Sequence, residues 1–350
     1  MKNIIGAKPE SAVAEVRFLT VDDESAGQRL DNFLFRHLKG VPKTHVYRII
    51  RSGEVRINRG RAQAESRLAV GDLVRLPPVR VAARAEEGAT PAAPAREFPL
   101  LLEDDALIAI DKPAGVAVHG GSGVSFGVIE QLRTARPTAR FLELVHRLDR
   151  ETSGILLVAK KRSALTALQD QFRERETGKT YLALVEGAWP ANRKVLDSSL
   201  AKYLLPSTKG STEPGERRVR VVAKDHPDAM RALTLVRVLG SLALPGDGRT
   251  LSLLAVTIKT GRTHQIRVHL ASAGHAIVGD DKYGDFERNR ALQKFGVKRM
   301  FLHAWRLQFN HPASGERTAL QADLPPELQA LMTPPLREAL AQAPVPTSHD

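Results

Sequence analysis

The chain has 350 residues, enough for one large domain and a smaller one, and 42% of them are hydrophobic, which allows a buried core. It contains no cysteine, which excludes a disulfide framework and thiolate metal sites. A formal net charge of +13 predicts a polyanionic partner such as a nucleic acid, because cationic side chains that neutralise phosphates release bound counterions; a basic surface that maintains solubility is the alternative.

The first ten residues, MKNIIGAKPE, hold only a short apolar pair before a charged residue and a proline. This is too short for the apolar region of a secretory signal, and no apolar run approaches the roughly 18 residues of a membrane span. Together with the lack of cysteine, these observations predict a cytoplasmic protein that has no membrane partner.

The segment from Arg29 to Arg67 is strongly basic, with ten Lys or Arg residues against three Asp or Glu. QRLDNFLFRHL (28–38) places its apolar residues on one helical face, and HVYRIIRSG (45–53) predicts a second short helix. EVRIN (54–58) alternates like a strand, and GDLVRLP (71–77) predicts another. The pattern predicts a small, basic α/β module.

Three features of this segment carry a resemblance: Arg29-Leu30-Asp31, then RIIRSGEVRIN (48–58), then GD (71–72) before the last strand. On these residues, 18–80 resembles the S4 RNA-binding module, which implies that it grips structured RNA. A generic small α/β domain with a charged face is the alternative. The candidate RNA-binding residues of this module are Arg29, Lys43, Arg48, Arg51 and Arg56.

Residues 81–97, rich in alanine and proline, show no apolar periodicity and predict a solvated linker. A larger domain is expected over 98–335, followed by a frayed tail over 336–350. In the larger domain several predicted strands follow one another without a helix between them. This order favours an α+β fold over a doubly wound one.

Several elements of the larger domain are predicted directly. ALIAIDKP (106–113) and ILLVAK (155–160) read as buried strands, and GVAVH (115–119) as a short one. SALTALQDQFRERE (163–176) predicts an amphipathic helix capped by Ser163, and THQIRVHLASAG (263–274) predicts a helix capped by Thr263 and ended by Gly274.

Asp149 is the first candidate for chemistry. It lies between Arg147 and Arg150 and is followed by a Thr-Ser-Gly break and an apolar strand. In an extended segment Arg147 and Asp149 point to the same side. A nearby cation would keep the carboxylate ionised, and an ionised carboxylate is a nucleophile. Judged from these residues alone, a buried Arg–Asp pair that pins a loop is the commoner meaning.

Four further motifs follow one another in the larger domain: HRLDRETSGILLVAK (146–160), KTYLALVEG (179–187), TGRTHQIRVHLASAGHAIVGDDKYG (260–284) and FLHAW (301–305). They resemble the motifs of the pseudouridine synthases of the ribosomal large-subunit class, over roughly 18–330. AVHGGSGVSFGVIEQLR (117–133) narrows the resemblance to one member of that class. The resemblance implies a catalytic domain with a mixed, largely antiparallel sheet and flanking helices.

The resemblance also implies roles for single residues. Asp149 matches the catalytic aspartate, which attacks either the uracil ring or the sugar. Tyr181 matches the tyrosine that packs on the target base and assists proton removal. Arg267 matches the arginine that pairs with the aspartate, and Arg147 the arginine that helps to turn the base out of the helix. Arg262 and His264 are further candidate RNA contacts.

The implied reaction is the conversion of uridines of 23S ribosomal RNA to pseudouridine, at more than one site. The implied partner is this RNA or a large-subunit precursor, bound by a monomer. No redox step or phosphoryl transfer occurs, so no cofactor or metal is expected. His264, His269 and His275 lack the spacing of a helical metal pair and are expected to face RNA or solvent.

The sequence departs from the family pattern in one stretch, where Pro227 and Arg231 replace an expected Lys and Thr. This departure puts the local RNA contacts in doubt. The preceding polar segment, 201–221, is expected to be a mobile loop. The acidic pair Asp280-Asp281 is assigned to a turn by default.

Three alternatives remain at this stage. Within the same class, the target uridines could lie elsewhere in ribosomal RNA or in tRNA. A non-catalytic RNA-binding factor for ribosome assembly would need no Asp149. A serine hydrolase is suggested by GVSFG (123–127), whose Ser125 fits a nucleophile-elbow pattern, although a glycine loop rather than a strand precedes it.

Overall fold

The computed structural model describes residues 15–22, 25–38, 40–79, 93–121, 124–205, 216–244 and 248–344. They form two compact units, Met1–Pro91 and Ala92–Asp350. Most of the predicted linker, residues 81–92, lies outside the described residues.

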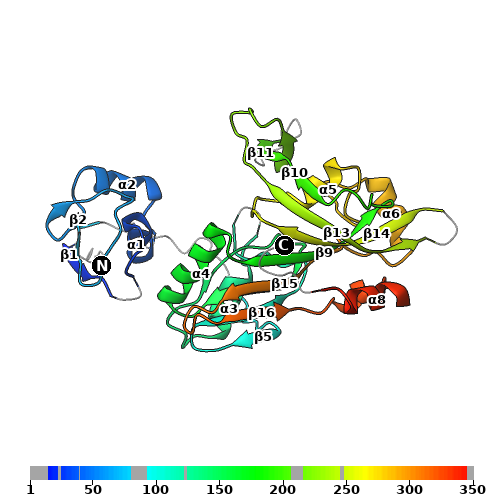
Figure 1. The fold of residues 1–350 in the computed structure, drawn as a ribbon. Coiled ribbons are helices and arrows are strands. Elements are labelled where there is room, and N and C mark those ends of the chain that lie inside the picture. Colours follow the sequence, from blue (N-terminus) through cyan, green and yellow to red (C-terminus); the bar gives the residue numbers. More distant parts are fainter. Residues whose placement is uncertain are drawn as a thin grey trace, which may run out of the picture. The chain divides into compact units, whose positions relative to one another are not determined.

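The N-terminal unit packs two helices on a four-stranded sheet of order β1-β4-β2-β3 (Figure 1). Its elements are β1 (Arg17–Thr20), α1 (Leu30–His37), α2 (Lys43–Arg51), β2 (Arg56–Ile57), β3 (Gly60–Arg61) and β4 (Leu73–Leu76). The predicted apolar face of α1 is buried together with Val46 and Ile49 of α2. Both predicted helices are therefore present, held by the apolar spacing that predicted them.

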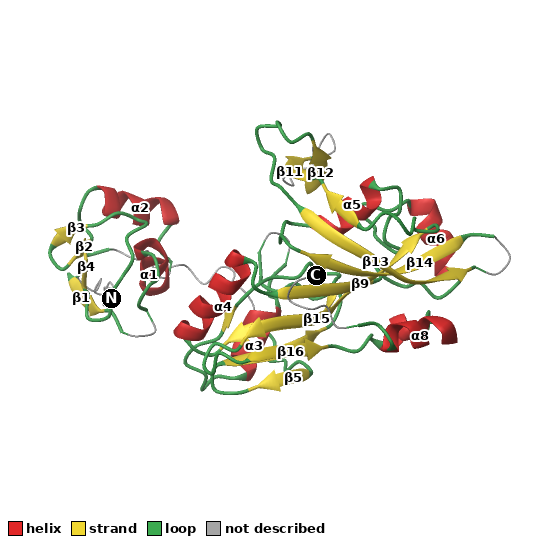
Figure 2. Ribbon diagram, viewed as in Figure 1, coloured by secondary structure: helices red, strands yellow, loops and turns green. Residues whose placement is uncertain are grey.

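The larger unit is built on a ten-stranded sheet of order β10-β13-β14-β9-β15-β8-β6-β5, with β16 beside β15 and β7 beside β8 (Figure 2). Its strands are β5 (Leu100–Glu103), β6 (Leu107–Lys112), β7 (Glu143–Leu144), β8 (Ser153–Ala159), β9 (Gly178–Glu186), β10 (Val195–Asp197), β13 (Leu233–Ala243), β14 (Thr250–Ile258), β15 (Leu302–Asn310) and β16 (Arg317–Gln321). In the part of the chain that the structure describes, every strand pair of this sheet is antiparallel except β8 and β15. The predicted mixed, largely antiparallel α+β fold is confirmed.

Helices flank this sheet (Figure 2). They are α3 (Val128–Ala135), α4 (Arg162–Glu174), α5 (Gln265–Ser272), α6 (Phe286–Gln293), α7 (Pro326–Gln329) and α8 (Pro334–Ala341). None of the helices in the described ranges is long and apolar enough to cross a membrane.

Strand β8 is buried along its whole length and divides the core into two layers. Ile155 and Leu157 join one apolar cluster with α4, whereas Leu156 and Val158 join another with α3. Successive side chains of a strand point to opposite faces, so a continuous apolar run is what a strand covered on both faces requires. The strand that follows Asp149 is thus fixed in the middle of the fold.

Gly154 explains the Thr-Ser-Gly break. It has φ +106° and pairs with Ala304 in the parallel β8–β15 ladder. A Cβ on Gly154 would lie 2.3 Å from the carbonyl oxygen of Ala304. Only glycine permits both this backbone conformation and this close approach.

Several predicted local features are corrected. GVAVH (115–119) forms turns because its backbone joins β6 to the loop before α3. The predicted cap Ser163 lies inside α4, whose N-cap is Lys161, and α5 is capped by His264 rather than Thr263. Leu336, placed in the predicted tail, belongs to α8 and is buried in the core.

The predicted mobile loop over 201–221 is corrected at its two ends, whereas its middle, 206–215, lies outside the described residues. Residues Ser199–Leu204 (β11) and Arg217–Val222 (β12) form a two-stranded antiparallel ribbon. The ribbon stands out from the main sheet of the larger unit (Figure 1). Its alternating Arg and Val residues form a strand because Val219 packs with Leu200 on one face while the arginines remain outside.

Candidate active site

The loop that carries Asp149 is held by groups buried beneath it. The Lys112 ammonium, fully buried, donates to the backbone carbonyls of Pro113 (2.8 Å), Val116 (2.9 Å) and Arg150 (3.1 Å). Burial lowers the pKa of Lys112 to about 7, although the carboxylates of Glu151 and Asp149 act in the opposite direction. These bonds tie the residue after Asp149 to the loop that follows β6.

His146 and Ser153, which precede and follow Asp149 in the same motif, anchor the loop at its two ends. His146 Nε2 accepts from the backbone N–H of Leu157 at 3.2 Å, and its ring stacks on Phe172. Ser153 Oγ lies 2.9 Å from His303 Nδ1 and accepts from Arg299 at 3.0 Å. These contacts fix the two ends of the segment around Asp149.

Arg267 holds the Asp149 carboxylate from below. Its Nη1 donates to Asp149 Oδ2 at 3.3 Å, while Nε and Nη2 make a bidentate pair with Asp280 at 2.8 and 2.7 Å. The side chains of Arg267 and Asp280 are 6% and 0% exposed. Burial alone would lower the pKa of Arg267, but Asp280 and Asp149 outweigh it and raise that pKa. The guanidinium therefore remains charged beside Asp149.

Asp280 was missed by the sequence analysis, which assigned it to a turn. Burial tends to raise the pKa of Asp280, but Arg267 and the backbone N–H groups of Lys282 and Tyr283 lower it. The signal in the sequence was the apolar HAIVG (275–279) directly before it, because an acid at the end of a buried segment needs a buried cation.

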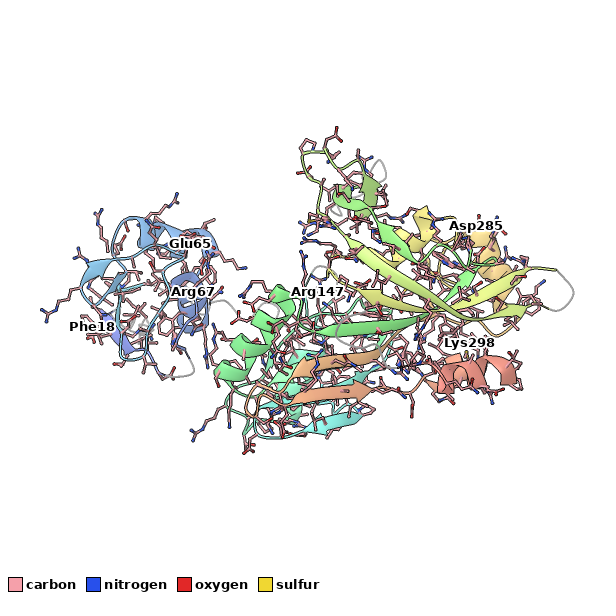
Figure 3. All side chains as sticks on the ribbon, viewed as in Figure 1. Phe18, Glu65, Arg67, Arg147, Asp285 and Lys298 are labelled. Atoms are coloured by element: carbon pink, nitrogen blue, oxygen red, sulfur yellow. The ribbon has the colours of Figure 1, made fainter. Side chains whose placement is uncertain are left out.

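Arg147 is not the cation that pairs with the Asp149 carboxylate. It is exposed, and no ion pair or hydrogen bond of its side chain is found within the described residues. Figure 3 shows it standing clear of the ribbon. Its guanidinium is therefore available to a ligand.

Tyr181 lies on β9, at the centre of the sheet, where it pairs with Val256 of β14 and Ala304 of β15. Its ring packs against two apolar clusters. Burial, and then the charge of Asp149, raise the pKa of Tyr181 well above its usual value. The phenol is therefore protonated in the resting protein.

Two hollows meet at Asp149. One, of about 400 Å³, is lined by Tyr181, Phe172 and Leu302. The other, of about 480 Å³, is lined by cations that include Lys298 and Arg299. The residues that line both hollows are Arg147, Leu148, Asp149, His264 and Arg267. A planar ring in the first hollow would therefore lie beside the carboxylate.

Arg262 and His264 are the two other candidate RNA contacts of the larger unit, and His264 lies within the site. Its Nε2 is 3.9 Å from Asp149 Oδ1. Arg262 lines the hollow that contains Tyr181, and its Nε donates to the carbonyl of Arg231 at 3.2 Å.

The candidates in the N-terminal unit occupy its surface. Arg29 pairs with Asp31 at 2.7 Å, and Arg48 pairs with Glu54 at 3.2 Å. Lys43 Nζ lies 5.4 Å from the centre of the Phe35 ring. Arg56 donates to the backbone carbonyls of Gly53 and Arg59, and Arg51 lines a surface hollow with Tyr47.

The expected orientation of His269 is wrong. Its ring is 1% exposed, with Nδ1 2.9 Å from Thr234 Oγ1 and Nε2 3.2 Å from the carbonyl of Ser198. Within the described ranges, no group of three or more His, Asp or Glu residues is arranged to hold a metal ion.

Comparison with known proteins decides the family. A model of RNA pseudouridylate synthases matches residues 106–272, and an S4 domain model matches residues 28–74. Ribosomal large subunit pseudouridine synthase C of Haemophilus influenzae is 47% identical to this chain over 91% of the chain and 95% of that protein. The protein of the same name from Escherichia coli (strain K12) is 49% identical, over 88% and 93%. The chain belongs to the RNA pseudouridine synthase family.

Solved structures agree with this assignment. Human RNA pseudouridylate synthase domain containing 1 is 26% identical, with a TM-score of 0.52 over 72% of this chain and 97% of that one. Human RNA pseudouridylate synthase domain containing 4 is 27% identical, with a TM-score of 0.51 over 67% and 92%. This synthase is therefore an isomerase with an N-terminal S4 domain, as the motifs predicted.

The hydrolase interpretation is wrong. Ser125 lies in a bend that no strand enters within the described residues, so it lacks the strand-to-helix elbow that exposes such a nucleophile. The family assignment also sets aside a purely RNA-binding assembly factor.

Proposed function

We propose that this synthase converts uridines of 23S ribosomal RNA, at more than one position, to pseudouridine with Asp149 as the nucleophile. The observation that carries this proposal is the position of Asp149. Its carboxylate is paired with the buried Arg267, is 20% exposed, and lies where the Tyr181 hollow meets the cationic one.

The target uridine must leave the RNA stack before it can reach this carboxylate, at a cost of a few kcal/mol. The Tyr181 ring offers an aromatic face that replaces part of the lost stacking. Arg147 is exposed and lines both hollows, so we propose that its side chain occupies the gap left in the RNA. The departing base and the entering guanidinium would then exchange places.

The reaction breaks the bond from N1 of uracil to C1′ of ribose and forms one from C5 to C1′. The ring gains a hydrogen at N1 and loses the hydrogen of C5, so composition and oxidation state are unchanged. If Asp149 attacks C1′, formation of the new bond displaces it; if it attacks the ring, it leaves when C5 loses its hydrogen and the ring double bond returns. The balance requires no added group.

Tyr181 could assist the loss of the C5 hydrogen only when its own proton is more easily given up. The negative charge of Asp149 helps to raise the pKa of Tyr181. A covalent adduct at Asp149 removes that charge, so the pKa of Tyr181 falls while the adduct persists. On the ring route, where the adduct lasts until C5 loses its hydrogen, the tyrosine is therefore a better proton carrier after the attack than before it.

The S4 domain would bind the same RNA through its surface cations. Lys43, Arg48 and Arg51 lie on α2, and Arg56 lies on β2. Arg29 shares its charge with Asp31 and is the weakest of these candidates. We propose that the protein acts as a monomer in the cytoplasm, on free 23S RNA or on a large-subunit precursor.

The substrate is tested with transcripts that carry tritium at C5 of uracil. Formation of the carbon–carbon bond must release the label to water. We expect release from 23S RNA, none from a tRNA transcript, and none from 23S RNA with the Asp149→Asn variant. Release from tRNA alone would overturn the proposed substrate, and equal release by Asp149→Asn would overturn the proposed nucleophile.

A further inference from the structure

A chain of three polar groups leads from the β11–β12 ribbon to the catalytic carboxylate. The backbone N–H of Val219, on β12, donates to Tyr283 Oη at 3.1 Å. Tyr283 Oη lies 2.8 Å from His264 Nδ1. His264 Nε2 lies 3.9 Å from Asp149 Oδ1, the oxygen that Arg267 does not hold.

The two ends of the chain set its direction, because the Val219 N–H can only donate and the Asp149 carboxylate can only accept. An amide N–H can only donate, so Tyr283 accepts from Val219 and keeps its own hydrogen for another acceptor. Among the bonds found in the described residues, His264 Nδ1 is the acceptor available to that hydrogen. An imidazole that accepts at Nδ1 carries its proton at Nε2 when neutral, and this N–H faces Asp149.

The surroundings of His264 favour its neutral form. Burial lowers the pKa of His264, and the cations Arg267 and Lys282 lower it further, against the opposing charges of Asp149 and Asp280. The phenol of Tyr283 acts in the same direction as the cations, because a hydrogen bond donated to Nδ1 stabilises the neutral ring. The ring therefore acts as a donor without bringing a second positive charge to the carboxylate.

The backbone at His264 is built to hold this position. His264 has φ +52°, a left-handed conformation that a residue with a Cβ rarely adopts. The Gln265 side chain supports it by accepting from Thr260 Oγ1 and the Arg262 N–H, at 2.7 and 3.1 Å. Unusual backbone geometry of this kind persists where the surrounding structure enforces it, often at functional sites.

We propose that His264 is a positioning residue for Asp149. Its neutral Nε2–H approaches Oδ1 while Arg267 holds Oδ2, so the plane of the carboxylate is fixed from two sides. The separation of 3.9 Å closes when RNA fills the site, as catalytic hydrogen bonds often do. The inference rests on the proposed role of Asp149. Because the chain begins on β12, the orientation of the carboxylate also depends on the ribbon.

Three variants test the proposal by single-turnover tritium release at saturating enzyme, with RNA affinity measured separately. His264→Leu removes the donor and should slow release by about 10- to 100-fold with unchanged affinity, the range expected for one hydrogen bond to a charged group. His264→Gln can place an amide N–H near the position of Nε2 and should recover most of the rate.

Tyr283→Phe separates this role from general support, because it keeps the ring that lies 5.1 Å from the Arg267 guanidinium and removes only the hydroxyl. Without the phenol hydrogen at Nδ1, the pKa of His264 rises. A protonated ring would hold the carboxylate more tightly and weaken it as a nucleophile. The acid limb of the rate profile should therefore move to higher pH in Tyr283→Phe.

The matched control is His226→Gln, in the turn after β12, which should match the wild type in rate and in pH profile. The proposal is overturned if His264→Leu reacts at the wild-type rate, or if it loses RNA affinity while its single-turnover rate is unchanged. An unmoved acid limb in Tyr283→Phe would also overturn it, even if His264→Leu failed to fold. Full release by Asp149→Asn would instead refute Asp149 as the nucleophile, on which this proposal rests.

Discussion

In the N-terminal unit, Arg48 and Glu54 pair at 3.2 Å with side chains that are 55% and 40% exposed. In the larger unit, Arg267 and Asp280 pair at 2.7 Å with side chains that are 6% and 0% exposed. Exposed pairs of the first kind contribute little to stability and leave the cation open to a phosphate. Loss of one member of a buried pair leaves an unpaired buried charge and lowers the free energy of unfolding strongly. Here the pair also holds the charged Arg267 beside the Asp149 carboxylate.

The largest expected effect is on the buried pair. Asp280→Asn keeps the shape of the side chain but leaves Arg267 without its main counter-charge, so the free energy of unfolding should fall by about 3–5 kcal/mol. Urea unfolding measures the change. Asp281→Asn, one residue further and exposed, is the matched control and should change stability by less than about 0.5 kcal/mol. An equal fall in the free energy of unfolding in both variants would show that the buried pair stabilises the fold no more than an exposed carboxylate does.

The second effect depends on pH. Lys112 has a pKa of about 7 in the folded protein and about 10.4 when unfolded. Between these values the unfolded chain binds a proton that the folded chain does not. The free energy of unfolding of the wild type should therefore rise with pH in this window, relative to Lys112→Met, by up to about 1.4 kcal/mol per pH unit.

Urea unfolding from pH 6.5 to 9.5 would compare the two proteins. Lys161→Met, at the exposed start of α4, provides the control and should follow the wild type across this range. Parallel curves for the wild type and Lys112→Met would refute the lowered pKa.

The third effect concerns RNA affinity. Lys43→Gln and Arg51→Gln each remove a cation from α2, so each should weaken RNA binding and reduce the slope of log affinity against log salt by about 1. The single-turnover rate at saturating enzyme should not change. Arg337→Gln in α8 is the control. A lower rate with unchanged salt dependence would contradict a role in phosphate binding.

The smallest effect is expected for the exposed pair itself. Glu54→Gln removes the partner of Arg48 and should lower the free energy of unfolding by less than about 1 kcal/mol. It should strengthen RNA binding slightly, because a negative charge is lost beside the cation. A loss as large as that of Asp280→Asn would erase the contrast between the two units.

The sequence could predict the parts of this molecule that depend on local pattern. The apolar face of α1 and the continuous apolar run of β8 follow directly from the spacing of their residues. The resemblance of the motifs to those of the family predicted Asp149, Tyr181 and Arg267 as site residues. In the structure all three line the same hollow.

Features that depend on distant contacts could not be predicted in this way. The burial of Asp280 requires the fold that brings Arg267 beneath it, and the cap at His264 requires the neighbouring contacts of Gln265. The ends of the predicted loop were misjudged because its arginines suggest a loop, whereas Val219 packs with Leu200 only once β11 lies beside β12. In each case the residues are polar in sequence, and their position depends on contacts with other segments of the fold.

The most direct test of the central claim is the single-turnover rate of tritium release from 23S RNA by wild type and Asp149→Asn, with each protein in saturating excess over the RNA. The amide keeps the size of the side chain and removes the charge that Arg267 maintains. We predict that release slows by at least about 10⁴-fold, as for the loss of other catalytic nucleophiles, with RNA affinity unchanged. A rate within tenfold of the wild type would contradict Asp149 as the nucleophile.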